Sequence, residues 1–98
     1  MNKYDNIHTL FNILNGCLSY AYDMTLRDNE TTIVLTKGDI DTIMYIYSNE
    51  CRENDFVGVI NYDGSDEIFD GENDTVLWTS EDGQIPLSDI LSDIKYYL

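Results

Sequence analysis

The stretch that decides the fold is TTIVLTKGDIDTIMYIY, residues 31–47. Its first six residues are compact and rich in β-branched side chains, which predicts a strand over residues 31–36. Residues 36–39 then match the helix capping-box pattern, with Thr36 and Asp39 at its two ends. Apolar residues follow at helical spacing, namely Ile40, Ile43, Met44, Tyr47 and Cys51. Together these signals predict a helix over residues 38–52.

A β-hairpin is the alternative for this stretch. Residues 42–47, TIMYIY, have the β-branched and aromatic composition that strands favour. The helix is preferred because the cap signal and the 3.6-residue period agree.

The residues before this stretch predict a helix over the first 26 positions. Asp5 is the expected N-cap, and Gly16 lies in the middle, at a cost of up to about 1 kcal/mol relative to alanine. We expect that glycine to let another element approach closely. The apolar face of this helix is formed by Ile7, Leu10, Phe11, Leu14, Cys17, Leu18 and Ala21.

The residues after it predict strands over 56–61, 67–69 and 75–79, followed by a helix over 86–98 with Pro86 in its first turn. Three turn dipeptides separate the strands as in hairpins, Asp63-Gly64, Asp70-Gly71 and Asp82-Gly83. The predicted order is α-β-α-β-β-β-α. This is an α+β fold with a small, mainly antiparallel β-sheet packed with two to three helices, in a single compact domain over residues 1–98.

The composition is strongly acidic. The 98 residues include 19 Asp or Glu and 5 Lys or Arg, for a net charge of −14, yet 43% of the residues are hydrophobic and 12% are aromatic. That apolar content excludes a disordered acidic tail. Direct binding to nucleic acid or to an anionic membrane is excluded as well, because both require basic patches. The expected partner is a basic protein.

The excess charge lies in the second half of the chain. Between Glu53 and Asp93 there are 12 acidic residues and no Lys or Arg. A net charge of −14 exceeds the roughly 2–8 units that keep a small domain soluble. This excess favours a functional role for the negative electrostatic field of the protein, beyond solubility. Acids two to four positions apart can match the phosphate spacing of DNA, about 3.4 Å along each strand. The expected partner-binding residues, called the acidic set below, are Asp63, Asp66, Glu67, Asp70, Glu72, Asp74, Glu81 and Asp82.

Few residues suggest catalysis or metal binding. His8 is the single histidine, which leaves no Ser-His-Asp or Cys-His arrangement to argue, and no glycine-rich phosphate loop occurs. Residues 63–74 have the length of a calcium loop, but Ile68 stands where that loop requires glycine. We therefore expect no enzyme activity, no cofactor and no metal site.

The cysteines and the N-terminus bear on the compartment. Cys17 and Cys51 are 34 positions apart with no C-x-x-C motif, which predicts two reduced, buried thiols. The first residues lack the apolar region of a signal peptide, and no stretch approaches 18 apolar residues. The expected location is the cytoplasm.

In its size, its charge and its acidic hairpin segment, the chain resembles the small acidic inhibitors that phages make against host defence, the DNA-mimicking anti-CRISPR and anti-restriction proteins. The resemblance implies a non-enzymatic inhibitor, in the cytoplasm of a bacterial host, that binds the cationic nucleic-acid site of a CRISPR effector or restriction enzyme. The chain is also similar to immunity proteins that neutralise basic nuclease toxins. A third possibility is a binding module whose charge only maintains solubility. A monomer is favoured over a dimer, because two bodies of like charge repel.

Overall fold

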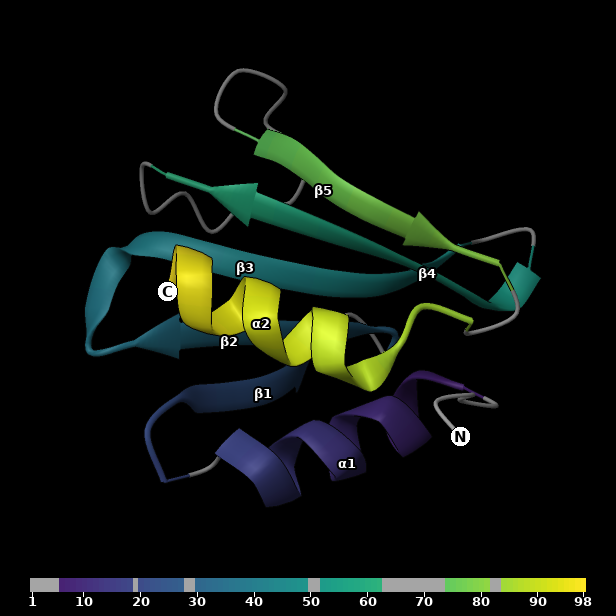
Figure 1. Cartoon of the computed structure of the whole chain (residues 1–98), viewed down its shortest axis with the longest axis horizontal. Helices are drawn as coiled ribbons and strands as arrows, with labels where there is room; N and C mark the ends of the chain where they lie inside the picture. The colour runs from purple at the N-terminus through teal and green to yellow at the C-terminus, as the bar shows by residue number, and fades with distance from the viewer. Residues whose placement is uncertain (1–5, 19, 28–29, 50–51, 63–73, 82–83) are drawn as a thin grey trace.

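The computed structural model describes residues 6–18, 20–27, 30–49, 52–62, 74–81 and 84–98, without the side chains at 39, 40, 49 and 52–54. The elements follow in the order α-β-β-β-β-β-α (Figure 1). They are α1 (Ile7–Leu18), β1 (Asp23–Arg27), β2 (Thr32–Lys37), β3 (Asp39–Asn49), β4 (Arg52–Asn61), β5 (Asp74–Ser80) and α2 (Leu87–Tyr97).

The five strands form one antiparallel sheet in the order β1-β2-β3-β4-β5. Each strand therefore pairs with its neighbours in the sequence, as in a β-meander. The predicted strands over 31–36, 56–61 and 75–79 correspond to β2, the end of β4, and β5. The predicted strand over 67–69 and the three Asp-Gly turns involve residues outside the described part of the chain.

The predicted helix over residues 38–52 is wrong, and with it the predicted order α-β-α-β-β-β-α. This segment forms β3 and the start of β4, as in the hairpin alternative. Gly38 has φ +67°, and Lys37 pairs with Asp39 across it. The turn requires the left-handed conformation that glycine adopts without steric cost, so this glycine belongs to a hairpin and not to a helix cap.

The helical spacing in β3 arises because this strand is buried on both faces. Met44 and Ile46 are buried on one face, while Ile43 and Tyr45 are buried on the other. A central strand of this kind is a continuous apolar run without alternation. Such a run also contains residues three and four positions apart, which is the pattern of an amphipathic helix.

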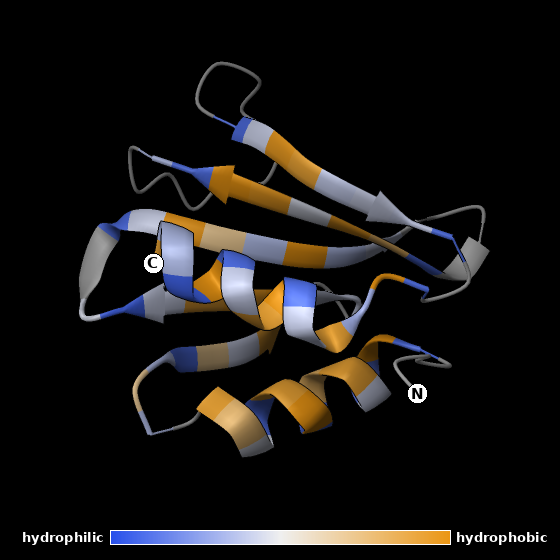
Figure 2. Ribbon diagram, viewed as in Figure 1, coloured by the Kyte–Doolittle hydropathy of each residue, from blue (hydrophilic) through white to orange (hydrophobic). Residues whose placement is uncertain are grey.

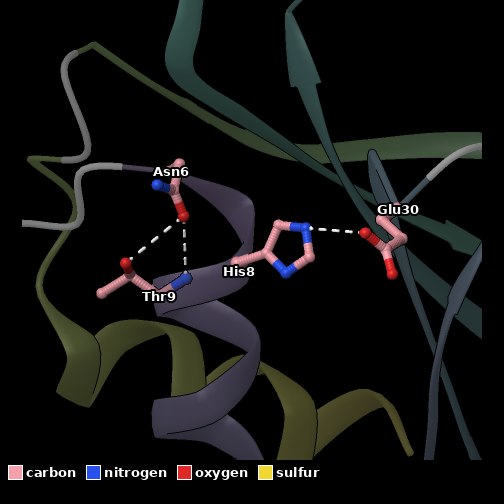
Figure 3. Close-up of polar contacts among 4 residues, drawn as sticks. All are labelled: Asn6, His8, Thr9 and Glu30. Carbon is pink, nitrogen blue, oxygen red and sulfur yellow. Dashed lines mark hydrogen bonds and ion pairs between the residues drawn. The ribbon is translucent and has the colours of Figure 1, made fainter.

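The predicted 26-residue N-terminal helix is wrong in its second half. The helix ends at Leu18, and β1 follows after a turn in which the Ala21 amide donates to the Leu18 carbonyl (3.0 Å). The N-cap is Asn6, one residue after the predicted Asp5. Its side-chain oxygen accepts hydrogen bonds from the amide (3.0 Å) and the hydroxyl (3.3 Å) of Thr9 (Figure 3).

Two further expectations for this helix fail. Cys17 is exposed, so it contributes nothing to the core and is not the buried thiol that was predicted. A Cβ added at Gly16 would meet nothing within 4 Å, so no element approaches the helix there. Cys51 lies outside the described residues.

Both helices pack on the same face of the sheet, called the helix-covered face below. Hydrophobic residues recur along both helices (Figure 2), and the buried ones pack against residues of the strands. They share a single cluster with alternate residues of β2, β3 and β4. The fully buried members of this cluster include Leu10, Leu14, Ile33, Leu35, Met44, Ile46, Phe56, Ile60, Ile90 and Ile94. A smaller cluster on the opposite face consists of strand residues, with Val34, Ile43, Tyr45 and Val59 buried.

Candidate functional site

Two of the eight residues of the acidic set lie in the described part of the chain. Asp74 is the first residue of β5, and Glu81 directly follows the last. Seven residue steps in an extended strand span about 23 Å, so these two carboxylates mark the two ends of β5. The remaining six lie outside the described residues, namely Asp63, Asp66, Glu67, Asp70, Glu72 and Asp82.

Asp74 is held against β4 by a hydrogen bond. The side-chain amide of Asn61, its pairing partner across the strands, donates to Oδ1 of Asp74 at 2.6 Å, and Asn61 is fully buried. The other carboxylate oxygen, Oδ2, is buried and has no hydrogen-bond partner among the described residues. Asp74 is therefore partly enclosed by the sheet, whereas Glu81 is exposed.

The charge of Asp74 is felt by a neighbouring tyrosine. The pKa of Tyr47 on β3 is raised, first by burial of its hydroxyl and second by the negative charge of Asp74. Both effects disfavour the tyrosinate anion.

The other end of β5 is fixed by Ser80. The Phe56 amide donates to the Ser80 hydroxyl oxygen (3.1 Å), and that hydroxyl donates to the Phe56 carbonyl (3.4 Å). Both residues are buried, so this pair satisfies polar groups that would otherwise be costly to bury.

Between its two ends, β5 approaches β4 closely at one glycine. The indole ring of Trp78 lies over Gly58, and a Cβ at position 58 would come within 3 Å of three ring atoms. A register shift follows directly, between Gly58 and Val59, which makes Leu77 an extra residue in β5.

Most of the cationic side chains that the structure describes lie on β1 and β2, at the other edge of the sheet from β5. Arg27 ends β1 and Lys37 ends β2, where its ammonium group lies 5.3 Å from the centroid of the Tyr22 ring. Because the sheet is a meander, the stretch without Lys or Arg from Glu53 to Asp93 includes nearly all of β4 and the whole of β5. The uneven distribution of charge along the sequence therefore becomes an uneven distribution across the sheet, with β1 and β2 on the cationic side and β4 and β5 on the acidic side.

The last helix adds acids of its own. The pKa of Asp93 on α2 is raised by partial burial and by the charge of Asp89, one helical turn earlier. The single cation of α2, Lys95, lies in its last turn, where it opposes the partial negative charge of the helix C-terminus.

Few other groups in the described residues could carry chemistry. The exposed side chains of His8 and Glu30 are in contact, with 3.2 Å between Nε2 and Oε2, and this contact joins α1 to the turn between β1 and β2 (Figure 3). Within the described ranges, no three His, Cys, Asp or Glu side chains are grouped so that they could hold a metal ion. None of the helices in the same ranges is long and apolar enough to cross a membrane.

Two features of the site were not anticipated from the sequence. One is that β5 is an edge strand, which depends on the order of the whole sheet. The other is the hydrogen bond from Asn61 to Asp74, which depends on the register of β4 and β5. Comparison with models of protein families, with curated proteins and with solved structures finds no match.

Proposed function

We propose that this protein is a non-enzymatic acidic inhibitor that binds the cationic nucleic-acid site of a host defence protein, a CRISPR effector or a restriction enzyme, in the bacterial cytoplasm. The observation that carries the proposal is the stretch from Glu53 to Asp93, with 12 acidic residues and no base, together with the meander that gathers β4 and β5 at one side of the sheet.

The physical basis of the proposal is competition for one electrostatic site. A nucleic-acid-binding groove is lined with Lys and Arg, and DNA gains affinity there mainly by phosphate contacts. A surface of carboxylates at similar intervals satisfies the same cations. The electrostatic field of such a surface also accelerates encounter with the partner, raising the association rate constant toward about 10⁸–10⁹ M⁻¹s⁻¹ at low salt.

The test begins with the partner. The immobilised protein is incubated with bacterial lysate at low ionic strength, and the bound proteins are eluted with rising salt and identified. We expect a basic nucleic-acid-binding defence protein that DNA displaces in competition. Recovery of no basic protein would overturn the proposal, and recovery of one cognate nuclease toxin would replace it with an immunity function.

A matched pair of variants then locates the contact. Glu81→Lys and Asp23→Lys each change the net charge by the same amount, at exposed positions on opposite edges of the sheet. If the β4–β5 side meets the partner, Glu81→Lys slows association by about tenfold at low salt, and Asp23→Lys changes it far less. Equal effects would show that only the net charge matters.

The residues of the acidic set between β4 and β5 are tested in the same way. The triple variant Asp66→Lys, Glu67→Lys and Asp70→Lys should slow association more strongly than Glu81→Lys, because it reverses three charges within five positions. An unchanged association rate would remove this segment from the contact surface.

A further inference from the structure

Among the described residues, no strand pairs with the outer edge of β5. In the part of the chain that the structure describes, β5 pairs with β4 alone. The Phe56 amide donates to Ser80, so the backbone polar groups of Phe56 point toward β5. These groups alternate in direction along an antiparallel strand. The next pair is Val57 with Thr79, and the amide and carbonyl of Thr79 therefore point away from β4, toward solvent.

The composition of this edge favours strand pairing. The five residues between Asp74 and Ser80 are Thr75, Val76, Leu77, Trp78 and Thr79, all of them uncharged and most of them strong strand formers. Thr75, Val76 and Thr79 are exposed, and 60% of the Val76 surface is accessible. Edge strands are commonly protected by proline or by a charge within the strand, and neither occurs between Asp74 and Glu81. The irregularity at Leu77 leaves the pairs on both sides of it regular.

We propose that β5 receives an extended, cationic segment of the partner protein as a sixth strand of the sheet. This inference rests on the proposed function, from which it takes the sign of the partner's charge. Main-chain hydrogen bonds to the outer edge of β5 would supply affinity, as in other cases of strand addition. Glu81 is exposed directly after the strand, so a cationic side chain at one end of a segment of about seven residues would meet its carboxylate. At the other end, the negative charge of the partly enclosed Asp74 favours a cation nearby.

Charge distinguishes this occupant from a second copy of the chain. Antiparallel pairing of two β5 strands would bring Asp74 of one copy near Glu81 of the other at both ends. It would also join two bodies that each carry a charge of −14. Like charges placed opposite each other destabilise a strand pair, and the net repulsion adds to this effect.

The other edge of the sheet is a poorer site for the same segment. β1 is five residues long against seven for β5, and it ends at Arg27, a cation. Its alternate residues Met24 and Leu26 pack against the core. A cationic strand is therefore expected to select β5.

The probe for the test is a nine-residue peptide of alternating arginine and valine, blocked at both ends. Its control carries N-methyl groups on two adjacent central residues, which removes one amide from each edge while the charge is kept. With ¹⁵N-labelled protein at low salt, we expect the plain peptide to change the amide chemical shifts along β5. It should also slow the hydrogen exchange of the Thr79 amide with solvent. The methylated peptide should bind at least tenfold more weakly.

Two variants at one position test the protein side. Thr79→Pro removes the outward amide, whose loss an edge position tolerates, whereas Thr79→Val keeps it. We expect Thr79→Pro to weaken both the peptide and the recovered partner at least tenfold, and Thr79→Val to bind as the parent does. Should Thr79→Pro fail to fold, the comparison of the plain and methylated peptides on the parent protein still tests the sixth strand.

The outcomes separate this inference from the proposed function. Equal binding of the plain and methylated peptides would overturn the sixth strand and leave an inhibitor that acts by charge alone. A salt-sensitive partner that binds Thr79→Pro as well as the parent would do the same. Dimers in sedimentation that the peptide dissociates would assign the edge to a second copy and also overturn the inference. Recovery of no basic partner would instead remove the proposed function.

Discussion

At the scale of single residues, Gly58 and Asp74 determine how β5 lies on β4. Gly58 leaves the space that the Trp78 ring fills, and Asp74 accepts the amide of Asn61. Each acts through an atomic contact that one substitution removes. Since β5 supplies the edge argued above, both residues bear on the proposed binding surface as well as on stability.

Gly58→Ala is expected to lower the free energy of unfolding by about 1–3 kcal/mol, because the new methyl group overlaps the indole ring. Urea unfolding followed by far-ultraviolet circular dichroism measures the change, with or without the tryptophan. The double variant with Trp78→Leu is the control, since a smaller side chain relieves the overlap. An unchanged midpoint for Gly58→Ala would contradict the close approach of the two strands.

Asp74→Asn is expected to lower the pKa of Tyr47 but to leave it above its ordinary value, because burial is the larger cause and remains. The unfolded chain ionises this tyrosine first as the pH rises, near pH 10, so the stability of the parent falls above that pH. The loss of stability above about pH 10 should be smaller in Asp74→Asn than in the parent.

Tyrosine ring ¹³C chemical shifts, followed by NMR against pH, measure this pKa. Asp89→Asn removes an acidic charge from α2, which packs on the face of the sheet opposite the cluster that Tyr47 joins, and it serves as the control, with no effect expected on Tyr47. A pKa that does not move in Asp74→Asn would show that Asp74 does not act on this tyrosine.

At the scale of elements, the sequence predicts those that show one clear period. α2 follows helical spacing and β5 has the composition of a strand, and the structure has both close to their predicted bounds. α1 follows helical spacing too, but it covers only residues 7–18 of the 26 predicted. β3 could not be predicted in this way, because burial on both faces removes its alternation. β1 was missed because Ala21 continues the helical spacing of Leu14 and Leu18 beyond the end of α1, although it lies in the turn before β1.

The candidate site was predictable only in part for a related reason. That acids flank a strand over residues 75–79 follows from local sequence. Whether that strand is central or at an edge depends on pairings between segments far apart in the chain, as does the contact of Asn61 with Asp74. Such pairings leave no periodic signal within either segment.

Two glycines in different elements give opposite expectations for the same substitution. Gly16→Ala should raise the free energy of unfolding by about 0.5–1 kcal/mol, since alanine favours a helix and the added Cβ meets nothing. Gly38→Ala should lower it by about 1–2 kcal/mol, since the hairpin turn needs φ +67°. Thermal and urea unfolding measure both, and a loss of stability in Gly16→Ala would contradict the exposed position.

At the scale of the whole molecule, the charge acts on the fold as a repulsive field. For a net charge of −14 on a body about 32 × 30 × 23 Å across, we expect neighbouring carboxylates about 10 Å apart. Two unit charges at that distance repel by about 0.4 kcal/mol in water, and salt at 0.15 M reduces this over about 8 Å. The same field that would attract a cationic partner therefore opposes folding in its absence.

Raising NaCl from 10 to 500 mM is expected to raise the free energy of unfolding by on the order of 1 kcal/mol, because screening relieves several such pairs. Urea is the suitable denaturant, since guanidinium is itself a salt. The free energy of unfolding of the triple variant Asp66→Lys, Glu67→Lys and Asp70→Lys should rise less with salt. A stability independent of salt would show that the carboxylates lie too far apart to interact.

The meander and the two terminal helices also set the course of folding. The turn at Gly38 closes a hairpin between adjacent segments, an event of microseconds, and β1 and β4 can add to it from either side. The helices differ, since α1 and α2 stand at opposite ends of the chain and share one cluster on the same face. Their docking requires the largest loop closure in the molecule. The rate-limiting step should therefore be the meeting of the chain ends over a sheet that is already formed, and truncation of α2 would release α1 before it releases β3.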